Sequence, residues 1–587
     1  MIAKAMVCAA LLAGLIAQAQ DDVAMRAMKD ELARTMSQIH LQGMEKPYFV
    51  AYRMDNLSRS AMSASLGSLT QDSPGQVRVI GVEIRVGNMN LDNTNFMSAR
   101  NFAGGGAGML GGIRQATLDD NYQQIRQAFW MATDAQYKKV LEDLSAKRAA
   151  LQAQNQTTRP PDFTAEPPST DMQQLEDATI PADDLKKLAR DVSAVFKTMP
   201  DLYDSSVDIE YIASNTRYLN SEGSSFTRSQ RTIKLNVNAR VQTADGLPIA
   251  DSIDLYGHSL ADFPKEDELI ARTRAMGERI LKLRSAAALE RYNGPVLFEG
   301  EAAPEIFAQQ FASGLAAGRI PLSDQTGFAE FFNQMLDQLG GHSFEDKIGG
   351  RVLPDFLNVT DNPTVSRFEG LDLMGNCEVD DEAVKTRETK LVEHGRLKTL
   401  LSTRVPTDAI SRSTGSRRGW GAAPSNLLVT TDQATTEADL RKQLLKLASD
   451  RGLTYGIVVR HIGGGSAAQF VKMAARLMQQ GAQSDNSIAE VYKLFPDGHE
   501  ELVQGAEITD MNAAAFKDIV AVGDTPAVYT DEYIPRIGAL FSAGVSSASQ
   551  VPVVSYVAPS MLFEELTLVK TQGPHPSLPI EPSPLVK

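Results

Sequence analysis

The chain has 587 residues, of which 43% are hydrophobic, 22% are charged and 6% are aromatic, and its formal net charge is −15 at pH 7. This length and apolar content are enough for two or three domains with hydrophobic cores. The acidic balance argues against nucleic acid as a partner, because phosphate binding requires a concentrated basic face. The small aromatic share gives no support to base stacking either.

The first residues have the pattern of a secretory signal. Lys4 precedes an apolar run over 6–16, and Ala17-Gln18-Ala19 has the small residues of a cleavage site. We therefore expect a signal peptide at 1–19 and an exported protein, periplasmic or extracellular. No later stretch approaches the roughly 18 consecutive apolar residues of a membrane-spanning helix. Without the signal, Cys377 is the only cysteine, so an internal disulfide is not expected.

A first α+β domain is expected at 20–293. Apolar residues recur at helical spacing over 22–46 and 265–292, and we interpret Asn293-Gly294-Pro295 as the end of the second helix and the domain boundary. Alternating apolar and polar residues predict strands between 47 and 100, including 77–86, and at 206–213, 216–219, 233–241 and 249–256.

An insertion is expected inside this domain at about 117–168. A glycine-rich loop at 101–116 leads into a helical pattern over 117–156, and prolines between Pro160 and Pro168 then require extended chain. A solvated surface helix is the simpler interpretation of the helical part, and a partner-docking arm is the functional alternative.

A second α+β domain is expected at 294–570, followed by a proline-rich tail at 571–587. Its predicted helices span 303–317 and 437–451. Its predicted strands include 296–299, 454–460 and 561–570, with further strands between 350 and 430.

Six short segments of this second domain stand out together. They are Lys347–Val352, Asn358–Thr364, Asp380–Val384, Leu391–Lys398, Ser413–Arg418 with Ala423–Asn426, and Tyr455–Ile457 with Gly463–Gly465. In this order they resemble the C-terminal domain of the TldD/PmbA metallopeptidase family, whereas the first domain resembles the family only loosely, mainly at 220–223. The resemblance implies a two-domain TldD/PmbA-like architecture, here with a helical insertion in the first domain.

Two of these segments carry charge that suits peptide binding. Asp380, Asp381 and Glu382 have the chemistry to bind a cation or a peptide amine, although a solvated turn before a strand is the simpler interpretation. Arg417 and Arg418 have the fork geometry to hold a peptide carboxylate. A structural ion pair with the acidic turn is the alternative.

The metal motif of the family is degenerate in this chain. The resemblance implies that active members carry a helical HExxxH, whose histidines bind zinc and whose glutamate is the general base, with a cysteine near the C-terminus. Here the equivalent run is Ala308-Gln309-Gln310-Phe311-Ala312-Ser313. Ala308 and Ser313 stand at the histidine positions and Gln309 at the base. Alanine cannot bind a metal, serine is a poor zinc ligand, and an amide cannot accept a proton usefully near neutral pH.

No replacement site is evident in the sequence. The segment 543–550, where the family's cysteine is expected, offers only hydroxyls and an amide. His342 with Glu345 and Asp346 is the nearest approach to a metal cluster, and we interpret it as a polar loop. Cys377 is interpreted as a partly buried small residue. We therefore expect neither catalytic nor metal-binding residues, and no cofactor.

Three functions remain as hypotheses. By its resemblance to inactive PmbA/TldE-type members, the chain is a non-catalytic subunit that binds peptides and pairs with a TldD-like catalytic subunit that performs the proteolysis. Alternatively it is a stand-alone exported binding or assembly protein, as a homo-oligomer, or a peptidase that uses a different site. Association with a histidine-bearing homologue, or its absence, distinguishes the first two, and metal content tests the third.

Overall fold

The computed structural model describes residues 22–98, 113–155, 159–177, 179–325, 327, 330, 343–465, 488–509, 511–533, 551–571 and 583–585. These residues form helices together with two large sheets, so the fold is α+β as the sequence predicts. The expected signal peptide, most of the loop at 101–116, the segment 543–550 and most of the tail lie outside the described residues.

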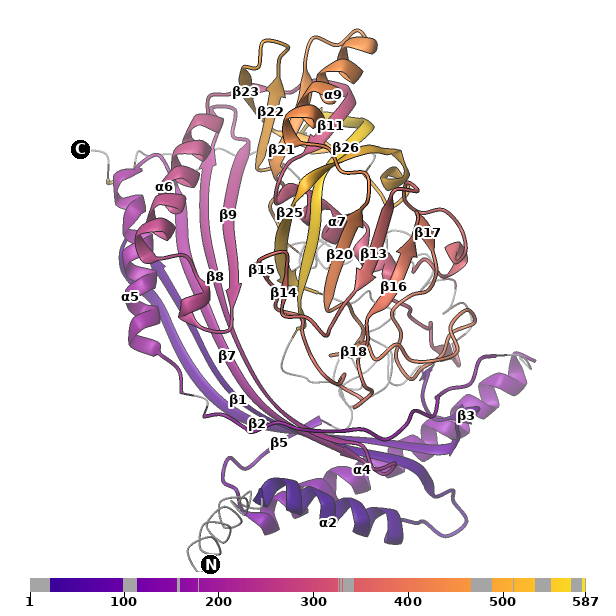
Figure 1. Ribbon diagram of the computed structural model, residues 1–587. Coiled ribbons are helices and arrows are strands. Elements are labelled where there is room, and N and C mark those ends of the chain that lie inside the picture. The colour runs from indigo at the N-terminus through magenta and orange to yellow at the C-terminus, as the bar shows by residue number, and fades with distance from the viewer. Residues whose placement is uncertain are drawn as a thin grey trace, which may run out of the picture.

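The first sheet consists mainly of long antiparallel strands, in the order β3-β2-β1-β7-β8-β6, with β5 paired to β2 and β9 paired to β8. It is strongly curved, and the C-terminal half of the chain lies on its concave side (Figure 1). The strands are β1 (Pro47–Ser65), β2 (Ser68–Asn88), β3 (Leu91–Asp92), β5 (Ile113–Ala116), β6 (Thr170–Met172), β7 (Asp204–Asn220), β8 (Ser225–Gln242) and β9 (Pro248–Gly257).

Helices cover the convex face of this sheet in two groups (Figure 1). Helices α5 (Ala182–Ser193) and α6 (Glu266–Leu283) bury an apolar cluster against β1, β7, β8 and β9. Helices α2 (Val23–Gln38) and α4 (Tyr122–Ala153) bury a second cluster against β1 and β2. The sheet therefore has an apolar convex face, which leaves the polar residues of its strands to the concave side.

The second sheet has the order β10-β23-β22-β21-β11-β26-β20-β13-β16-β17, with β24 and β25 paired to β26. Its core packs around helix α7 (Ala302–Gln310), while α9 (Glu437–Asp450) buries leucines against β11 and β21. The strands are β10 (Ala287–Ala288), β11 (Arg291–Phe298), β13 (Leu357–Asp361), β16 (Thr389–Glu393), β17 (Arg396–Leu397), β20 (Asn426–Thr431), β21 (Gly456–His461), β22 (Glu490–Leu494), β23 (Glu500–Gln504), β24 (Ala506–Ile508), β25 (Ile519–Glu532) and β26 (Val553–Lys570).

Small elements complete the described chain. Parallel strands β4 (Phe96–Met97) and β12 (Leu322–Ser323) join the two halves of the chain, and two short hairpins lie in the second half. The hairpins are β14–β15 (Arg367–Phe368, Leu371–Asp372) and β18–β19 (Arg417–Arg418, Gly421–Ala422), and the 3-10 turns are η2 (Ala194–Thr198), η3 (Leu260–Asp262), η4 (Ala312–Leu315), η5 (Glu345–Lys347) and η6 (Ala515–Asp518). Among the described helices, none is long and apolar enough to cross a membrane.

The prediction of a helix over 265–292 is wrong at its C-terminal end. Helix α6 ends at Leu283, and Asn293-Gly294-Pro295 does not terminate it but lies within strand β11. Strand β11 forms at this point because it pairs with both β21 and β26, which are more than 150 residues away in the sequence. Long-range pairing therefore overrides the local helical pattern.

The helical pattern over 117–156 is confirmed as α4, but the interpretation of a solvated surface helix is wrong. One face of α4 is fully buried against β2 and α2, through residues such as Phe129, Tyr137 and Leu144. Its N-terminus is fixed by Asn121, whose side chain accepts the N–H groups of Gln123 and Gln124.

Candidate functional site

Helix α7 carries the degenerate metal motif, but it is shorter than the predicted helix over 303–317. It ends at Gln310, and Ser313 follows in the separate turn η4, so Ala308 and Ser313 do not share one continuous α-helix. The helix ends where the ring of Phe311 enters the core, 5.1 Å from the rings of Phe307 and Phe344. Aromatic packing therefore occupies the turn in which a second metal ligand would be presented.

Glu305 is the buried carboxylate of this helix, and it accepts hydrogen bonds from the backbone. It accepts the N–H groups of Ile462 and Gly463 at 2.8 and 2.7 Å. The amide of Gln309 donates to Glu305 at 3.3 Å and to the carbonyl oxygen of Gly463 at 3.4 Å. Burial raises the pKa of Glu305 to about 7. Gln309 is the residue that the family resemblance aligns with the general base. In this structure its amide connects the helix to the glycine loop by hydrogen bonds.

His461, at the end of β21, lies beside Glu305. Its Nδ1 is 3.0 Å from Asp251 Oδ1 on β9, and its Nε2 is 3.9 Å from Glu305 Oε1. Burial by itself would lower the pKa of His461, but the negative charges of Glu305 and Asp251 outweigh it and raise this pKa to about 10. The imidazole is therefore protonated at neutral pH and links the two sheets as a cation.

These residues do not fit the zinc ion that the family resemblance implies. Zinc needs several imidazole, thiolate or carboxylate ligands together, whereas Ala308 and Ser313 offer none, Nδ1 of His461 faces Asp251, and both oxygens of Glu305 accept backbone N–H groups. Within the described ranges, no group of three His, Cys, Asp or Glu side chains is arranged to hold a metal ion. His342, from the alternative cluster, lies outside those ranges.

The acidic turn is not the solvated turn that the simpler interpretation expects. Asp380, Asp381 and Glu382 are buried, with exposed fractions of 1%, 8% and 7%. Asp381 lies 3.3 Å from both Arg53 and Arg228 of the first sheet. Burial would raise the pKa of Asp381, but these guanidinium groups outweigh it and lower the pKa to about 2. The solvated-turn interpretation is wrong because the first sheet covers the turn.

The arginine pair is buried as well and meets the acidic turn through the backbone. The N–H of Arg417 donates to Asp380 at 3.0 Å, and that of Gly419 donates to Asp381 at 2.7 Å. The guanidinium of Arg418 donates to the carbonyl oxygen of Gly375 and to the sulfur of Cys377, both at 2.8 Å. The structure therefore brings the five predicted peptide-binding residues together, but beneath the surface, and none of them lines the cavity described next.

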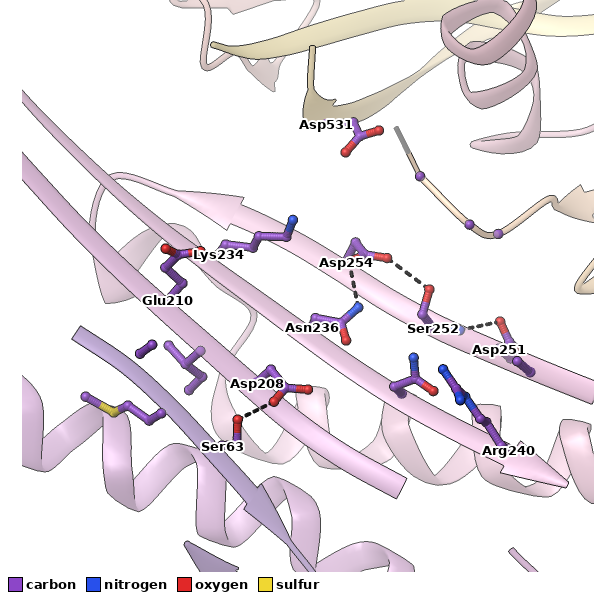
Figure 2. Close-up of a pocket in the computed structure, with 18 of the residues that line it drawn as sticks. Ser63, Asp208, Glu210, Lys234, Asn236, Arg240, Asp251, Ser252, Asp254 and Asp531 are labelled. Carbon is purple, nitrogen blue, oxygen red and sulfur yellow. Dashed lines mark hydrogen bonds between the residues drawn. The ribbon is translucent and has the colours of Figure 1, made fainter. Parts of the chain in front are cut away.

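A cavity of about 560 Å³ lies between the concave face of the first sheet and the second half of the chain. Its lining comes from β7, β8 and β9 on one side and from Gly463–Gly465 and Asp531 on the other (Figure 2). Asp251, the partner of His461, is also part of the lining, so the cavity adjoins the degenerate motif.

The cavity was not predicted from the sequence, although the residue pattern of strand β8 indicated one of its polar walls. In β8, Lys234, Asn236, Asn238 and Arg240 alternate with apolar residues that are buried beneath α5 and α6. Such alternation predicts a polar face. It does not show that the opposite wall is formed by residues more than 200 positions later in the sequence.

Residues 291–570 match the family model of the PmbA/TldA metallopeptidase C-terminal domain. The C-terminal domain belongs to the PmbA/TldD family. A protein named "Metalloprotease" from Methanothermobacter thermautotrophicus is 25% identical over 206 residues, which are 34% of this chain and 38% of the relative. This match thus spans well under half of the relative's length.

Solved structures show a similar fold over both halves of the chain. A candidate modulator of a DNA gyrase from Thermotoga maritima superposes with a TM-score of 0.55 and 14% identity, covering 92% of this chain and 99% of that one. TldE from Thermococcus kodakarensis superposes with a TM-score of 0.52 and 11% identity, covering 92% of this chain and all of that one, 100%. At such identities the likeness concerns the fold alone.

Proposed function

We propose that this chain is an exported, non-catalytic subunit that binds peptides and pairs with an active TldD-like metallopeptidase. Membership of its C-terminal domain in the PmbA/TldD family supports a role related to proteolysis. The observation that supports the non-catalytic part is the environment of Glu305 and Gln309, whose polar atoms are hydrogen-bonded to each other and to the backbone at 462–463.

Peptide binding is supported by the cavity beside this motif. A volume of about 560 Å³ is within the usual range for small-molecule or peptide side-chain sites. Its walls carry both charged and neutral polar side chains, which suits recognition of a peptide more than of an apolar ligand. The degenerate motif and the cavity together favour a subunit that holds substrate for chemistry performed elsewhere.

The test compares this chain alone, a histidine-bearing homologue from the same source alone, and the two mixed. We expect no stoichiometric zinc and no peptide cleavage from this chain, and co-elution with cleavage from the mixture. Changing the glutamate of the homologue's own motif should abolish cleavage by the mixture, whereas Ser313→Ala in this chain should not. One tightly bound zinc per chain with cleavage by this chain alone would contradict the proposal and favour a peptidase with a different site. If this chain forms a homo-oligomer and does not associate with the homologue, the result would favour a stand-alone binding protein.

Export has its own test. N-terminal sequencing of the protein from the periplasm or the medium should give a mature start at Gln20 or Asp21. Retention of residues 1–19 in a cytoplasmic product would contradict the export part and leave the rest of the proposal standing.

A further inference from the structure

A second cavity, of about 480 Å³, lies at the end of the second sheet where β17 is the last strand. Its lining comes mainly from residues 387–390 at the start of β16, from residues 398–399 after β17, and from the loop 409–414. None of its lining residues belongs to the cavity between the two sheets. The charged groups of the lining are four cations and one carboxylate, namely Arg387, Lys390, Lys398, Arg412 and Glu388.

The charge of this cavity is opposite in sign to that of the whole chain, whose net charge is −15. A protein with such an excess of carboxylates repels other anions over most of its surface. A concave site with a local excess of cations reverses this effect over a short range. The cavity therefore favours an anionic ligand that the rest of the chain disfavours.

The carboxylates near the cavity compensate only part of this positive charge. Lys390 and Lys398 share Glu393, whose oxygens lie 3.5 and 3.7 Å from the two ammonium groups. One carboxylate neutralises at most one of the two lysines. Glu388 forms no ion pair among the residues that the structure describes, and it accepts the amide of Asn362 at 3.1 Å. Asn362 does not line the cavity, so Glu388 is directed away from the arginines.

The two arginines keep donors for a ligand. Arg387 donates a hydrogen bond to the carbonyl oxygen of Ser413, which orients its guanidinium and occupies one of its five N–H groups. In the described part of the chain, Arg387 has no carboxylate partner, and the guanidinium of Arg412 has neither a carboxylate nor a carbonyl partner. Both side chains are exposed. Their positive charges are thus not neutralised by these residues.

The loop that carries Arg412 is held in place by its backbone. The carbonyl oxygen of Arg412 accepts the hydroxyl of Ser402 at 2.8 Å. The N–H of Ser402 donates to Thr414 Oγ1 at 2.7 Å, and the N–H of Thr414 donates to Ser402 Oγ at 3.1 Å. Ile410, in the same loop, is buried. A cation on a fixed loop loses less conformational freedom when it binds a ligand.

From this arrangement we propose that the cavity docks an acidic segment of a partner protein, whose carboxylates bind Arg387 and Arg412. Guanidinium groups suit this ligand because they donate two parallel hydrogen bonds to one carboxylate. Nucleic acid is disfavoured because the cations gather in one cavity rather than along an extended face. The inference goes beyond the proposed function and does not rest on it, since the two cavities share no residue.

The test is fluorescence anisotropy of the mature full-length chain with two labelled peptides, which differ only in whether their three central residues are glutamate or glutamine. We expect the glutamate peptide to bind about tenfold more tightly at low salt, as hydrogen bonds between charged groups imply. Added salt should reduce this preference, because the cations are exposed.

Two variants locate the site. Arg412→Gln and Arg387→Gln should each reduce the preference for glutamate several-fold while leaving binding of the glutamine peptide unchanged. Arg396→Gln is the matched control. Arg396 is also exposed and donates to a backbone carbonyl oxygen, that of Gly349 at 3.3 Å, but it does not line the cavity. The control removes the same charge from the chain and should keep the wild-type preference.

Three outcomes would overturn the proposal. Equal binding of the two peptides would show that the cavity does not recognise carboxylates. An equal loss of preference in Arg396→Gln and Arg412→Gln would show an effect of net charge alone. If light scattering shows self-association at low salt that Arg412→Gln abolishes, the occupant is a second copy of the chain rather than a partner. None of these results bears on zinc content or cleavage, so the proposed function is tested separately.

Discussion

At the scale of single residues, the degenerate motif is stabilised by a charge from another part of the chain. His461 brings a protonated imidazole to within 3.9 Å of Glu305 and contacts Asp251 on the other sheet. Asp251 in turn binds Arg279, which lies 3.1 Å from Glu490. The cluster is a set of paired charges that joins the two sheets.

The histidine should make stability depend on pH. Its pKa is about 10 in the folded protein, against 6.5 as the ordinary value. The stabilisation is complete below pH 6.5 and is lost as the pH rises toward 10, because the folded state then holds a proton that the unfolded state has released. From pH 6.5 to pH 10, the free energy of unfolding of the wild type should therefore decrease by about 2–4 kcal/mol more than that of His461→Gln. Urea denaturation at several pH values measures this difference.

His499→Gln is the control, since His499 pairs with Asp497 while half exposed in a turn. That variant should keep the wild-type pH profile. Equal profiles for the wild type and His461→Gln would show that His461 does not carry the buried charge. The raised pKa of Glu305 should also lower the free energy of unfolding as the pH rises, but between pH 4.5 and about 7. Burial favours the protonated carboxyl in the folded state, and this stabilisation is lost when the carboxyl ionises.

At the scale of elements, one buried lysine adds a polar contact to the apolar packing of α4 against the domain. Lys147 Nζ donates to the carbonyl oxygens of Asp92, at 2.9 Å, and of Thr94, and pairs with Asp162 at 2.7 Å. Asp162 belongs to the proline-rich segment that follows the helix. Burial lowers the pKa of Lys147 to about 8 against the opposing effect of Asp162. Helix and proline-rich segment are thus joined at one point.

Removing this cation should destabilise the insertion strongly. Lys147→Met leaves two buried carbonyl oxygens without their donor and removes one cation from Asp162, which keeps its pairs with Arg159 and Arg319, so the change should cost about 2–4 kcal/mol. Lys138→Met, on the exposed face of the same helix, removes only an i,i+4 pair with Asp134 and should cost about 0.5 kcal/mol or less. Thermal unfolding with limited proteolysis of α4 measures both. Equal costs would mean that the buried contacts do not hold the helix.

At the scale of the whole molecule, the two halves are joined by charges and apolar contacts far from the cavity. Arg404 donates two hydrogen bonds to Glu222, at 2.6 and 3.0 Å, and a third to the carbonyl oxygen of Thr164. Phe49 and Phe226 of the first sheet pack with Val379 of the acidic-turn region. This junction joins the first sheet to the second half of the chain.

A double-mutant cycle tests the junction. Arg404→Met and Glu222→Gln, alone and combined, should give a coupling energy of about 1–3 kcal/mol, because the guanidinium is almost fully buried. The exposed pair of Arg367 and Asp372, at 2.8 Å, is the comparison and should show almost no coupling. Chemical denaturation of each variant provides the energies. A coupling no larger than that of the exposed pair would show that the contact does not join the halves.

The sequence by itself determined the elements whose pattern is local. The strand at 77–86 and the helices at 117–156 and 437–451 followed from residue periodicity and formed close to the expected positions. The prediction that the family's metal motif is degenerate also came from the sequence, because alanine and glutamine lack the needed groups wherever the helix lies.

Only the tertiary structure decided what surrounds those elements. The acidic turn is buried because a distant strand covers it, α6 gives way to β11 because β26 and β21 offer backbone partners, and His461 meets Asp251 from 210 positions away. Periodicity shows which face of a strand is polar, but the neighbour of that face depends on the order of the strands in the sheets. The charge state of the site and the walls of the cavity therefore follow from the topology, since electrostatic free energies depend on distances in space rather than along the chain.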